Sequence, residues 1–247
     1  MSQDKLPLAV EIEINHDCNR ACPYCPNSRT ARTEEGSMDP ALFRRLMEQL
    51  RDLGFSGRIS YHFYNEPLLC KDLDLFVAMT REHLPRSFIE LYTNGTLLDP
   101  ERIRRLFALG VSKFRITEHA KVRLDALRER IAALPEEDRS RIHLLSFREL
   151  PLTNRGGLVS AGKRDVKPPF SLPCFIPYCA VVVTLKGNVV PCYEDYHQHN
   201  AMGNILDRPF GEIWNSDRYR SFREDLKKGK RSCYQACDRC NNLAIIS

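Results

Sequence analysis

The sequence lacks any long apolar run. Its 247 residues are 43% hydrophobic and 28% charged, its mean hydropathy is -0.40, and no stretch approaches the ~20 apolar residues that a membrane-spanning helix needs. The beginning of the chain does not form a secretory signal, because its apolar run is short and the acidic Glu11 and Glu13 follow. We therefore expect a cytoplasmic protein with no membrane partner.

Internal repeats and low-complexity tracts are also missing, and the surplus of positive charge is small. Lysine and arginine number 37 against 32 aspartate and glutamate residues, which gives a net charge of +5. The densest basic run, residues 227–231, is not interleaved with aromatic residues as nucleic-acid-binding segments are. A solvated helix end explains this run, and we expect no nucleic-acid partner.

Cysteine, by contrast, is plentiful, with ten residues. In a reducing compartment clustered cysteines bind metal or perform redox chemistry more often than they form disulfides. Cys18, Cys22 and Cys25 lie close enough in sequence to hold three irons of a four-iron cluster, which leaves the fourth iron open to another ligand. The alternatives are a zinc knuckle completed by His16 and three buried cysteines without metal.

Strand and helix patterns alternate over the first 146 residues. We predict strands at residues 8–14, 58–64, 88–93, 113–117 and 141–146, and helices that begin near residues 40, 72, 100 and 123. Two of these helices start with an aspartate followed by proline, which is a capping residue with proline at the first helical position. The alternation predicts an α/β fold, a partial TIM-type parallel (β/α) barrel of about five strands.

The pattern changes after residue 150, where proline, glycine and asparagine crowd together. We divide the chain into a barrel domain (1–150), an irregular connection (151–169) and a small C-terminal domain (170–247). In that last domain we predict a β-hairpin at residues 180–191 and a helix over 210–228.

Four cysteines of the C-terminal domain bracket its hairpin and helix, and four thiolates can hold a second four-iron cluster completely. They are Cys174, Cys192, Cys237 and Cys240. Zinc bound by the same four thiolates remains open, as does the replacement of one of them by Cys179 or Cys233.

The spacing Cys18-x3-Cys22-x2-Cys25, with Tyr24 before the last cysteine, resembles the motif of the radical S-adenosylmethionine (SAM) enzymes. Asn65-Glu66-Pro67 lies where that family has a Gly-Gly-Glu-Pro segment beside the methionine amino group, with Asn65 in place of a glycine. The resemblance implies that SAM binds the first cluster. Its expected contacts, all at the carboxyl ends of predicted strands or in the cysteine motif, are Tyr24, Asn65, Glu66, Asn94 and Thr117.

The C-terminal cysteines resemble the shortened auxiliary-cluster module of this family, the twitch domain. Residues 62–70, 92–95, 154–157 and 191–195 further resemble the radical SAM dehydrogenases of aminoglycoside biosynthesis. This implies oxidation of a secondary alcohol of an aminocyclitol or aminoglycoside precursor to a ketone. A 5'-deoxyadenosyl radical would take the hydrogen atom, the auxiliary cluster would receive an electron, and an external donor such as a flavodoxin would supply the first electron.

The residues expected to handle the substrate lie at loops and strand ends. Arg155, in a glycine-bounded loop, is placed to orient a substrate oxygen and stabilise an alkoxide. Glu194, two residues after Cys192, is placed to take the hydroxyl proton or to pair with a substrate ammonium. Tyr64 and Tyr92 end adjacent strands and are expected to line the substrate pocket. An exposed arginine, a surface glutamate and aromatic core packing are the respective alternatives.

Two other functions fit the same residues. In an epimerase, the substrate radical would take a hydrogen atom from a cysteine, for which Cys70, Cys179 and Cys233 are available. A binding module without enzymatic activity would hold zinc and neither iron nor sulfide.

Overall fold

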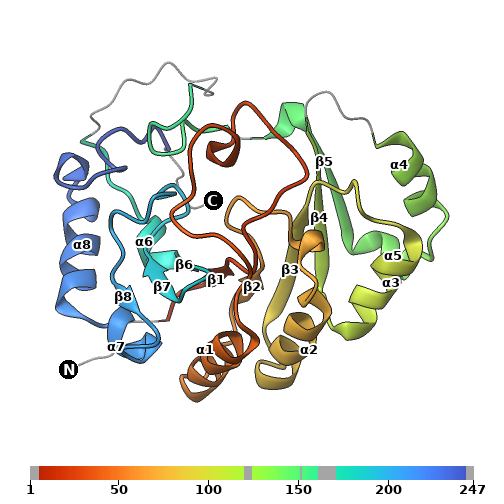
Figure 1. The fold of residues 1–247 in the computed structure, drawn as a ribbon, viewed down its shortest axis with the longest axis horizontal. Helices are drawn as coiled ribbons and strands as arrows, with labels where there is room; N and C mark the ends of the chain where they lie inside the picture. The colour runs from red at the N-terminus through yellow and green to blue at the C-terminus, as the bar shows by residue number, and fades with distance from the viewer. Residues whose placement is uncertain (1–5, 120–123, 151, 161–170, 243–247) are drawn as a thin grey trace.

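The computed structural model describes residues 6–119, 124–150, 152–160 and 171–242. Its strands form one sheet in the order β5-β4-β3-β2-β1-β6-β7-β8 (Figure 1). The strands are β1 (Ala9–Ile12), β2 (Arg58–Ser60), β3 (Phe88–Thr93), β4 (Lys113–Glu118), β5 (Ile142–Ser146), β6 (Ala180–Val183), β7 (Asn188–Val190) and β8 (Gly203–Asn204). The expected α/β fold is confirmed. The pairings from β5 through β1 to β6 are parallel, and β7 and β8 are antiparallel to their neighbours.

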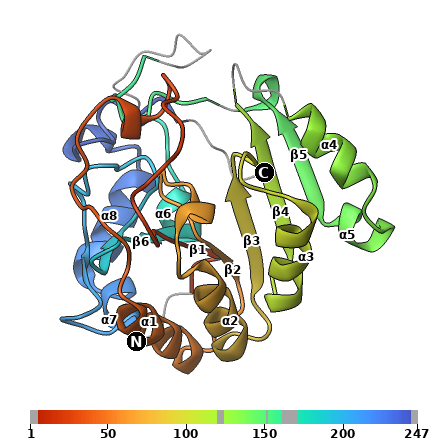
Figure 2. The ribbon, with the colours of Figure 1, turned by 45° about the vertical axis from the view of Figure 1, so that its right-hand side comes forward.

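Helices α1 (Pro40–Asp52), α2 (Leu73–His83), α3 (Pro100–Leu109) and α4 (Asp125–Ala132) lie along the outer side of the parallel strands (Figures 1 and 2). The capping residues act as the sequence predicts. The Asp39 carboxylate accepts a hydrogen bond of 2.6 Å from the Ala41 amide, and Asp99 accepts one of 2.7 Å from the Arg102 amide. One face of α1 is buried through its apolar residues, so capping and burial fix this helix together.

Strand β2 is shorter than the expected 58–64, because the chain turns sharply after it. Tyr64 has a φ of 66°, a left-handed conformation that a strand does not accommodate. The Asn65 side-chain oxygen accepts a hydrogen bond of 2.7 Å from the Phe63 amide, which stabilises the turn. The turn leads into a short 3-10 helix, η2 (Pro67–Leu69).

Two helical predictions also need correction. The helix expected to begin near residue 123 is α4, followed by a separate α5 (Glu136–Ser140) that begins after Pro135; residue 123 lies outside the described residues. The expected helix over 210–228 is two helices, α7 (Phe210–Trp214) and α8 (Asp217–Lys227). Ser216 caps α8 by accepting a hydrogen bond of 3.2 Å from the Tyr219 amide, so a new helix starts there.

The C-terminal hairpin of β6 and β7 is confirmed, but it also extends the main sheet. β6 pairs in parallel with β1, with Val10 opposite Val181 and Ile12 opposite Val183. These apolar residues are fully buried. The short helix α6 (Ile176–Cys179) precedes β6, and 3-10 turns occur at η1 (Pro26–Ser28), η3 (Phe147–Glu149) and η4 (Arg231–Cys233). In the part of the chain that the structure describes, no helix is long and apolar enough to cross a bilayer.

Candidate active site

A cavity of about 250 Å³ lies at the carboxyl ends of the parallel strands, beneath the loop between β1 and α1. This loop arches across that end of the sheet in Figures 1 and 2. The cavity brings together residues that the sequence analysis selected from five segments: Cys18, Cys22, Tyr24, Cys25, Tyr64, Asn65, Glu66, Tyr92, Asn94, Thr117 and Arg155. It is also lined by residues that the sequence analysis did not select: Arg20, His62, Phe63, Thr93, His119 and Tyr193.

The three cysteines of the β1–α1 loop face this cavity from one compact turn. The Cys25 amide donates a hydrogen bond of 3.0 Å to the Cys22 carbonyl. Burial raises the pKa of Cys25 to about 11; the Asn27 amide and the charge of Arg155 oppose that rise, and the neighbouring Cys18 and Cys22 thiols add to it. A thiolate at this position therefore needs a positive partner, which a bound iron cluster would provide. The chemistry of the three donors fits such a cluster.

Glu66 is buried and held in one orientation. Its carboxylate accepts hydrogen bonds of 2.7 Å from the Thr93 hydroxyl and 2.8 Å from the Asn94 amide. Burial raises the pKa of Glu66, while the hydrogen bonds from Asn94, Thr93 and Leu68 act in the opposite direction. The carboxylate lines the cavity in a fixed position and can accept a further hydrogen bond from a cationic group there.

The side chains of Asn65 and Asn94 are used within the protein. Asn65 donates a hydrogen bond of 2.7 Å to the Asn15 side-chain oxygen. Asn94 donates one of 2.8 Å to the side chain of Asn19 in the cysteine loop, and its own oxygen accepts hydrogen bonds from Thr96. These two residues therefore position the loops around the cavity.

Tyr24 packs against a histidine that the sequence analysis left unassigned. The Tyr24 hydroxyl and Nδ1 of His119 share a hydrogen bond of 2.8 Å, and their ring centres are 5.9 Å apart. Burial lowers the pKa of His119 to about 4, and the nearby positive charges of Arg20 and Arg155 lower it further. His119 is therefore neutral near pH 7, and this part of the cavity is aromatic and uncharged at that residue.

Charged residues from neighbouring strands form a network around His62 and Tyr92, which both line the cavity. The rings of His62 and Tyr92 stack with centres 4.4 Å apart, and Nδ1 of His62 lies 3.0 Å from Oε2 of Glu11. Arg58 donates hydrogen bonds of 2.6 Å to both Glu11 and the Tyr92 hydroxyl. Tyr92 is thus held by its hydroxyl as well as by packing, and it lines the cavity.

Arg155 and Tyr64 form the wall nearest the C-terminal part of the chain. Both have left-handed backbone conformations, with φ of 52° and 66°, which are uncommon for side chains of this size and occur often at functional sites. The Arg155 guanidinium carbon lies 5.5 Å from the centre of the Tyr64 ring. Burial lowers the pKa of Arg155, but the neighbouring Tyr64 and Glu194 raise it more, so the pKa is raised overall and the guanidinium stays charged.

Glu194 is buried behind Arg155 and does not line the first cavity. Its carboxylate accepts hydrogen bonds of 2.9 Å from the Thr153 hydroxyl and 2.8 Å from the Asn242 amide group, and it lies 3.8 Å from the Arg155 guanidinium. It lines instead a second cavity, together with the four C-terminal cysteines. Glu194 thus lines the second cavity and lies next to Arg155, which lines the first.

Cys174, Cys192, Cys237 and Cys240 all line the second cavity. Burial raises the pKa of Cys240 to about 12, with a further rise from the charge of Glu194. The pKa of Cys192 is also raised, first by burial and then by the charges of Cys174 and of Glu194. Four thiols that line one cavity fit a bound metal cluster, because only a strong cationic partner would keep them deprotonated.

The remaining cysteines lie elsewhere. Cys70 is buried in the core and points to the Ile14 carbonyl at 3.8 Å. Cys233 is exposed and Cys179 is partly buried, and neither lines the first or the second cavity. Within the described ranges, no three His, Cys, Asp or Glu side chains converge closely enough to hold a single metal ion.

The two cysteine groups fall within the matches to two different family models. Residues 12–138 match the radical SAM superfamily, and residues 174–241 match SPASM, an iron-sulfur cluster-binding domain. The chain belongs to the radical SAM superfamily. This membership confirms the resemblance that the cysteine motif suggests.

Individual relatives cover almost the whole chain. It is 45% identical over 244 residues to the S-adenosyl-L-methionine-dependent 2-deoxy-scyllo-inosamine dehydrogenase of Niallia circulans. The aligned region covers 98% of this chain and 96% of that protein. The crystal structure of BtrN in complex with AdoMet and 2-DOIA has a TM-score of 0.92 at 45% identity, with 99% of this chain and 96% of that chain covered. BtrN in an open conformation has a TM-score of 0.79 at 41% identity, with 98% and 95% covered.

Proposed function

We propose that this protein is a radical SAM dehydrogenase that oxidises a secondary alcohol of an aminocyclitol, such as 2-deoxy-scyllo-inosamine, to a ketone. The relative with this activity aligns over 98% of the chain. The observation that carries the proposal is the position of Arg155 and Glu194. Arg155 lines the cavity with three cysteines, and Glu194, 3.8 Å away, lines the cavity with four.

The proposed cofactors are SAM and two four-iron clusters. Cys18, Cys22 and Cys25 would hold the first cluster, and Cys174, Cys192, Cys237 and Cys240 the second. The bound groups would supply the radical that removes hydrogen and the acceptor that takes the remaining electron. An external one-electron donor such as a flavodoxin is part of the proposal.

The chain's own residues bind and orient the reactants. Glu66, fixed by Thr93 and Asn94, would accept a hydrogen bond from the amino group of SAM, and Tyr24 and Thr117 would contact the rest of that cofactor. The backbone around Asn65 and Asn94 completes the cofactor wall. Tyr64 and Tyr92 would contact the substrate, since both line the cavity.

Arg155 would hold the oxygen of the hydroxyl group that is oxidised. Its raised pKa keeps it charged, so its role is to stabilise negative charge on that oxygen rather than to remove the proton. We assign the proton to His62, which lines the cavity and whose Nδ1 lies 3.0 Å from Oε2 of Glu11. Glu194, whose carboxylate lies 3.8 Å from the guanidinium and outside the first cavity, would hold Arg155 in its orientation.

The epimerase alternative is not favoured. An epimerase of the kind considered above needs a cysteine beside the substrate that is free to give up a hydrogen atom. Cys70, Cys179 and Cys233 all lie away from the first cavity, and the cysteines that line it are those of the cluster motif.

The test is a turnover assay with anaerobically reconstituted protein, SAM, a reductant and 2-deoxy-scyllo-inosamine. The expected result is equal amounts of 5'-deoxyadenosine and of a ketone that has lost two hydrogen atoms, with no carbon-bound deuterium when the assay is run in deuterium oxide. A product that has lost no hydrogen atoms and carries a carbon-bound deuterium would identify an epimerase. If 2-deoxy-scyllo-inosamine is not consumed while 5'-deoxyadenosine accumulates, the proposed substrate is wrong.

A further inference from the structure

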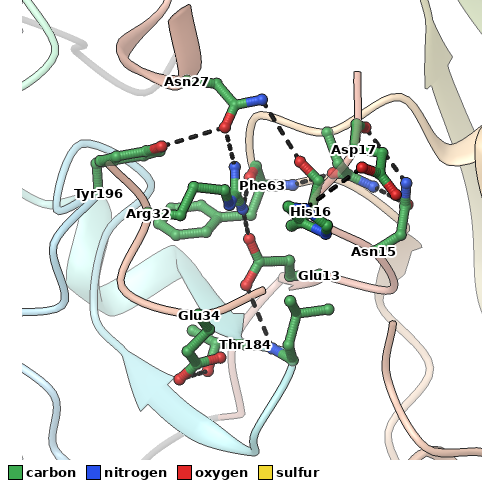
Figure 3. Close-up of polar contacts among 12 residues, drawn as sticks. Glu13, Asn15, His16, Asp17, Asn27, Arg32, Glu34, Phe63, Thr184 and Tyr196 are labelled. Atoms are coloured by element: carbon green, nitrogen blue, oxygen red, sulfur yellow. Dashed lines mark hydrogen bonds and ion pairs between the residues drawn. The ribbon is translucent and has the colours of Figure 1, made fainter. Parts of the chain in front are cut away.

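Arg32, in the second half of the β1–α1 loop, is a buried cation that joins four segments of the chain. Its side chain is 8% exposed and forms an ion pair with Glu13, which is 2% exposed. Arg32 donates hydrogen bonds of 2.7 Å to the Asn27 side chain and 3.3 Å to the Phe63 carbonyl, and its guanidinium carbon lies 5.4 Å from the centre of the Tyr196 ring. Figure 3 shows Arg32 between these partners.

Each of these partners leads to one part of the active site. Asn27 follows Cys25 by two residues, and the Tyr196 hydroxyl donates a hydrogen bond of 3.1 Å to its side chain. Phe63 precedes Tyr64, whose left-handed backbone turns the Tyr64 ring towards Arg155. Tyr196 lies four residues after Cys192. Arg32 therefore contacts the neighbours of the first cysteine group, of the substrate wall and of the second cysteine group at once.

Glu34 fastens the same loop to the C-terminal part of the chain at a second point. Its carboxylate accepts hydrogen bonds of 3.1 Å from the Thr184 hydroxyl, 3.0 Å from the Lys186 amide and 2.9 Å from the Asn188 side chain. These three donors belong to the turn between β6 and β7 and to the strand ends beside it. Neighbouring Glu35 is exposed.

We propose that Arg32 and Glu34 are positioning residues that fix the first cysteine loop against the C-terminal iron-sulfur module, and so keep hydrogen abstraction coupled to removal of the second electron. The inference rests on the proposed function. Arginine suits this position because its planar group donates in several directions at once, whereas a lysine offers a single charged point. Displacing reacting groups by as little as ~1 Å can reduce a rate by about a hundredfold.

A role in coupling differs from a role in folding in what a substitution changes. Loss of fold removes both clusters and both products together. Loss of positioning leaves the clusters in place and allows SAM to be cleaved, but the substrate radical or the second cluster is then displaced from its productive position. The quantity that reports this is the amount of ketone formed per 5'-deoxyadenosine.

The experiment compares Arg32→Lys and Glu34→Gln with two matched controls, Arg44→Lys and Glu35→Gln, whose parent side chains are exposed. Lysine keeps a positive charge beside Glu13, which avoids an unpaired buried carboxylate. For both loop variants we expect full iron content and unchanged EPR spectra of the two reduced clusters. The ketone formed per 5'-deoxyadenosine should fall by about tenfold or more, and the amides of residues 26–37 should exchange with deuterium faster than in the wild type.

The possible outcomes separate this inference from the proposed function. Variants that keep the wild-type product ratio and exchange rates overturn the role of Arg32 and Glu34. Variants that lose iron and both products in parallel show a structural role only, which also overturns it. If the control variants change the product ratio and the exchange rates as much as the loop variants do, the role of Arg32 and Glu34 is also overturned. If the wild type makes no ketone, the proposed function fails, while the exchange measurement still tests the attachment of the loop.

Discussion

Nη1 of Arg155 lies 3.8 Å from Oε1 of Glu194, and this contact joins the two cysteine-lined cavities of the protein. The arginine faces the first cavity and the glutamate faces the second. A group bound against the guanidinium is therefore close to residues that surround the C-terminal cysteines. The pair provides a short path between the place where a substrate would react and the place where an electron would be collected.

Replacing Glu194 with glutamine should slow ketone formation. The amide keeps the shape of the side chain but removes the charge that pairs with half-buried Arg155. We expect a loss of about tenfold or more in turnover, equivalent to ~1.4 kcal/mol in the barrier, with both clusters retained. Single-turnover kinetics on anaerobic protein would measure it. His62→Gln is the comparison, and turnover that survives in that variant would contradict the assignment of the proton to His62.

Replacing Cys192 with serine should remove the second cluster only. Cys192 lines the four-cysteine cavity, and no residue of the β1–α1 loop lines that cavity. Iron should fall from about eight to about four atoms per chain, and 5'-deoxyadenosine should still form while the ketone does not. Cys233→Ser is the matched control, because Cys233 is exposed and outside both cavities. Full iron content in Cys192→Ser would contradict the assignment of this ligand.

Gly95, which follows β3 at the rim of the sheet, should not tolerate a side chain. Its φ is +74°, and a Cβ atom there would lie 2.6 Å from Cγ2 of buried Ile116. Gly54 has a similar φ of +70° with nothing within 4 Å, so Gly54→Ala isolates the backbone cost. We expect Gly54→Ala to cost about 1 kcal/mol and Gly95→Ala to cost more, by up to ~3 kcal/mol from overpacking. Urea unfolding measures both, and equal losses would show that Ile116 moves aside freely.

Glu11 should make the stability depend on pH in the acid range. Burial raises the pKa of Glu11, but the charge and hydrogen bond of His62 and the charge of Arg58 outweigh it and lower the pKa from 4.5 to about 2. The folded state therefore favours the carboxylate by ~3 kcal/mol. This contribution is fully present above about pH 4.5 and is lost as the pH falls towards about 2.

The comparison of wild type with Glu11→Gln tests this dependence. Between about pH 6 and about pH 3, the free energy of unfolding should fall more steeply for the wild type than for Glu11→Gln, because only the wild type must protonate a stabilised carboxylate. Glu35→Gln, an exposed substitution, should follow the wild type. Parallel curves for wild type and Glu11→Gln would show that Glu11 does not contribute in this way.

The sequence predicts the order of elements and the residues of the first cavity well, because both depend on local patterns. Alternating strands and helices with Asp-Pro caps define the parallel units, and the residues that end each strand must meet at one edge. The same reasoning selected Glu66, Asn94 and Thr117. All three line the cavity, although their contacts with a cofactor stay predictions.

The interactions between distant segments could not be predicted in this way. Arg32 shows no local pattern that distinguishes it from exposed arginines, yet it is buried by partners from three other segments. His119 gains its low pKa from burial and from Arg20 and Arg155, which are far away in sequence. The left-handed turn at Tyr64 was also missed, since its residue type favours a strand, whereas the Asn65 side chain stabilises the turn.

The parallel pairing of β6 with β1 means that the two iron-sulfur regions are not interchangeable building blocks. A shortened version that stops before β6 would leave the hydrogen-bonding groups of β1 exposed along one side, a surface that invites aggregation. Transplanting the C-terminal region onto another barrel would likewise require a recipient strand with a matching sequence of small apolar side chains. Any exchange of specificity between such enzymes is therefore better attempted in the loops above the sheet than by joining halves.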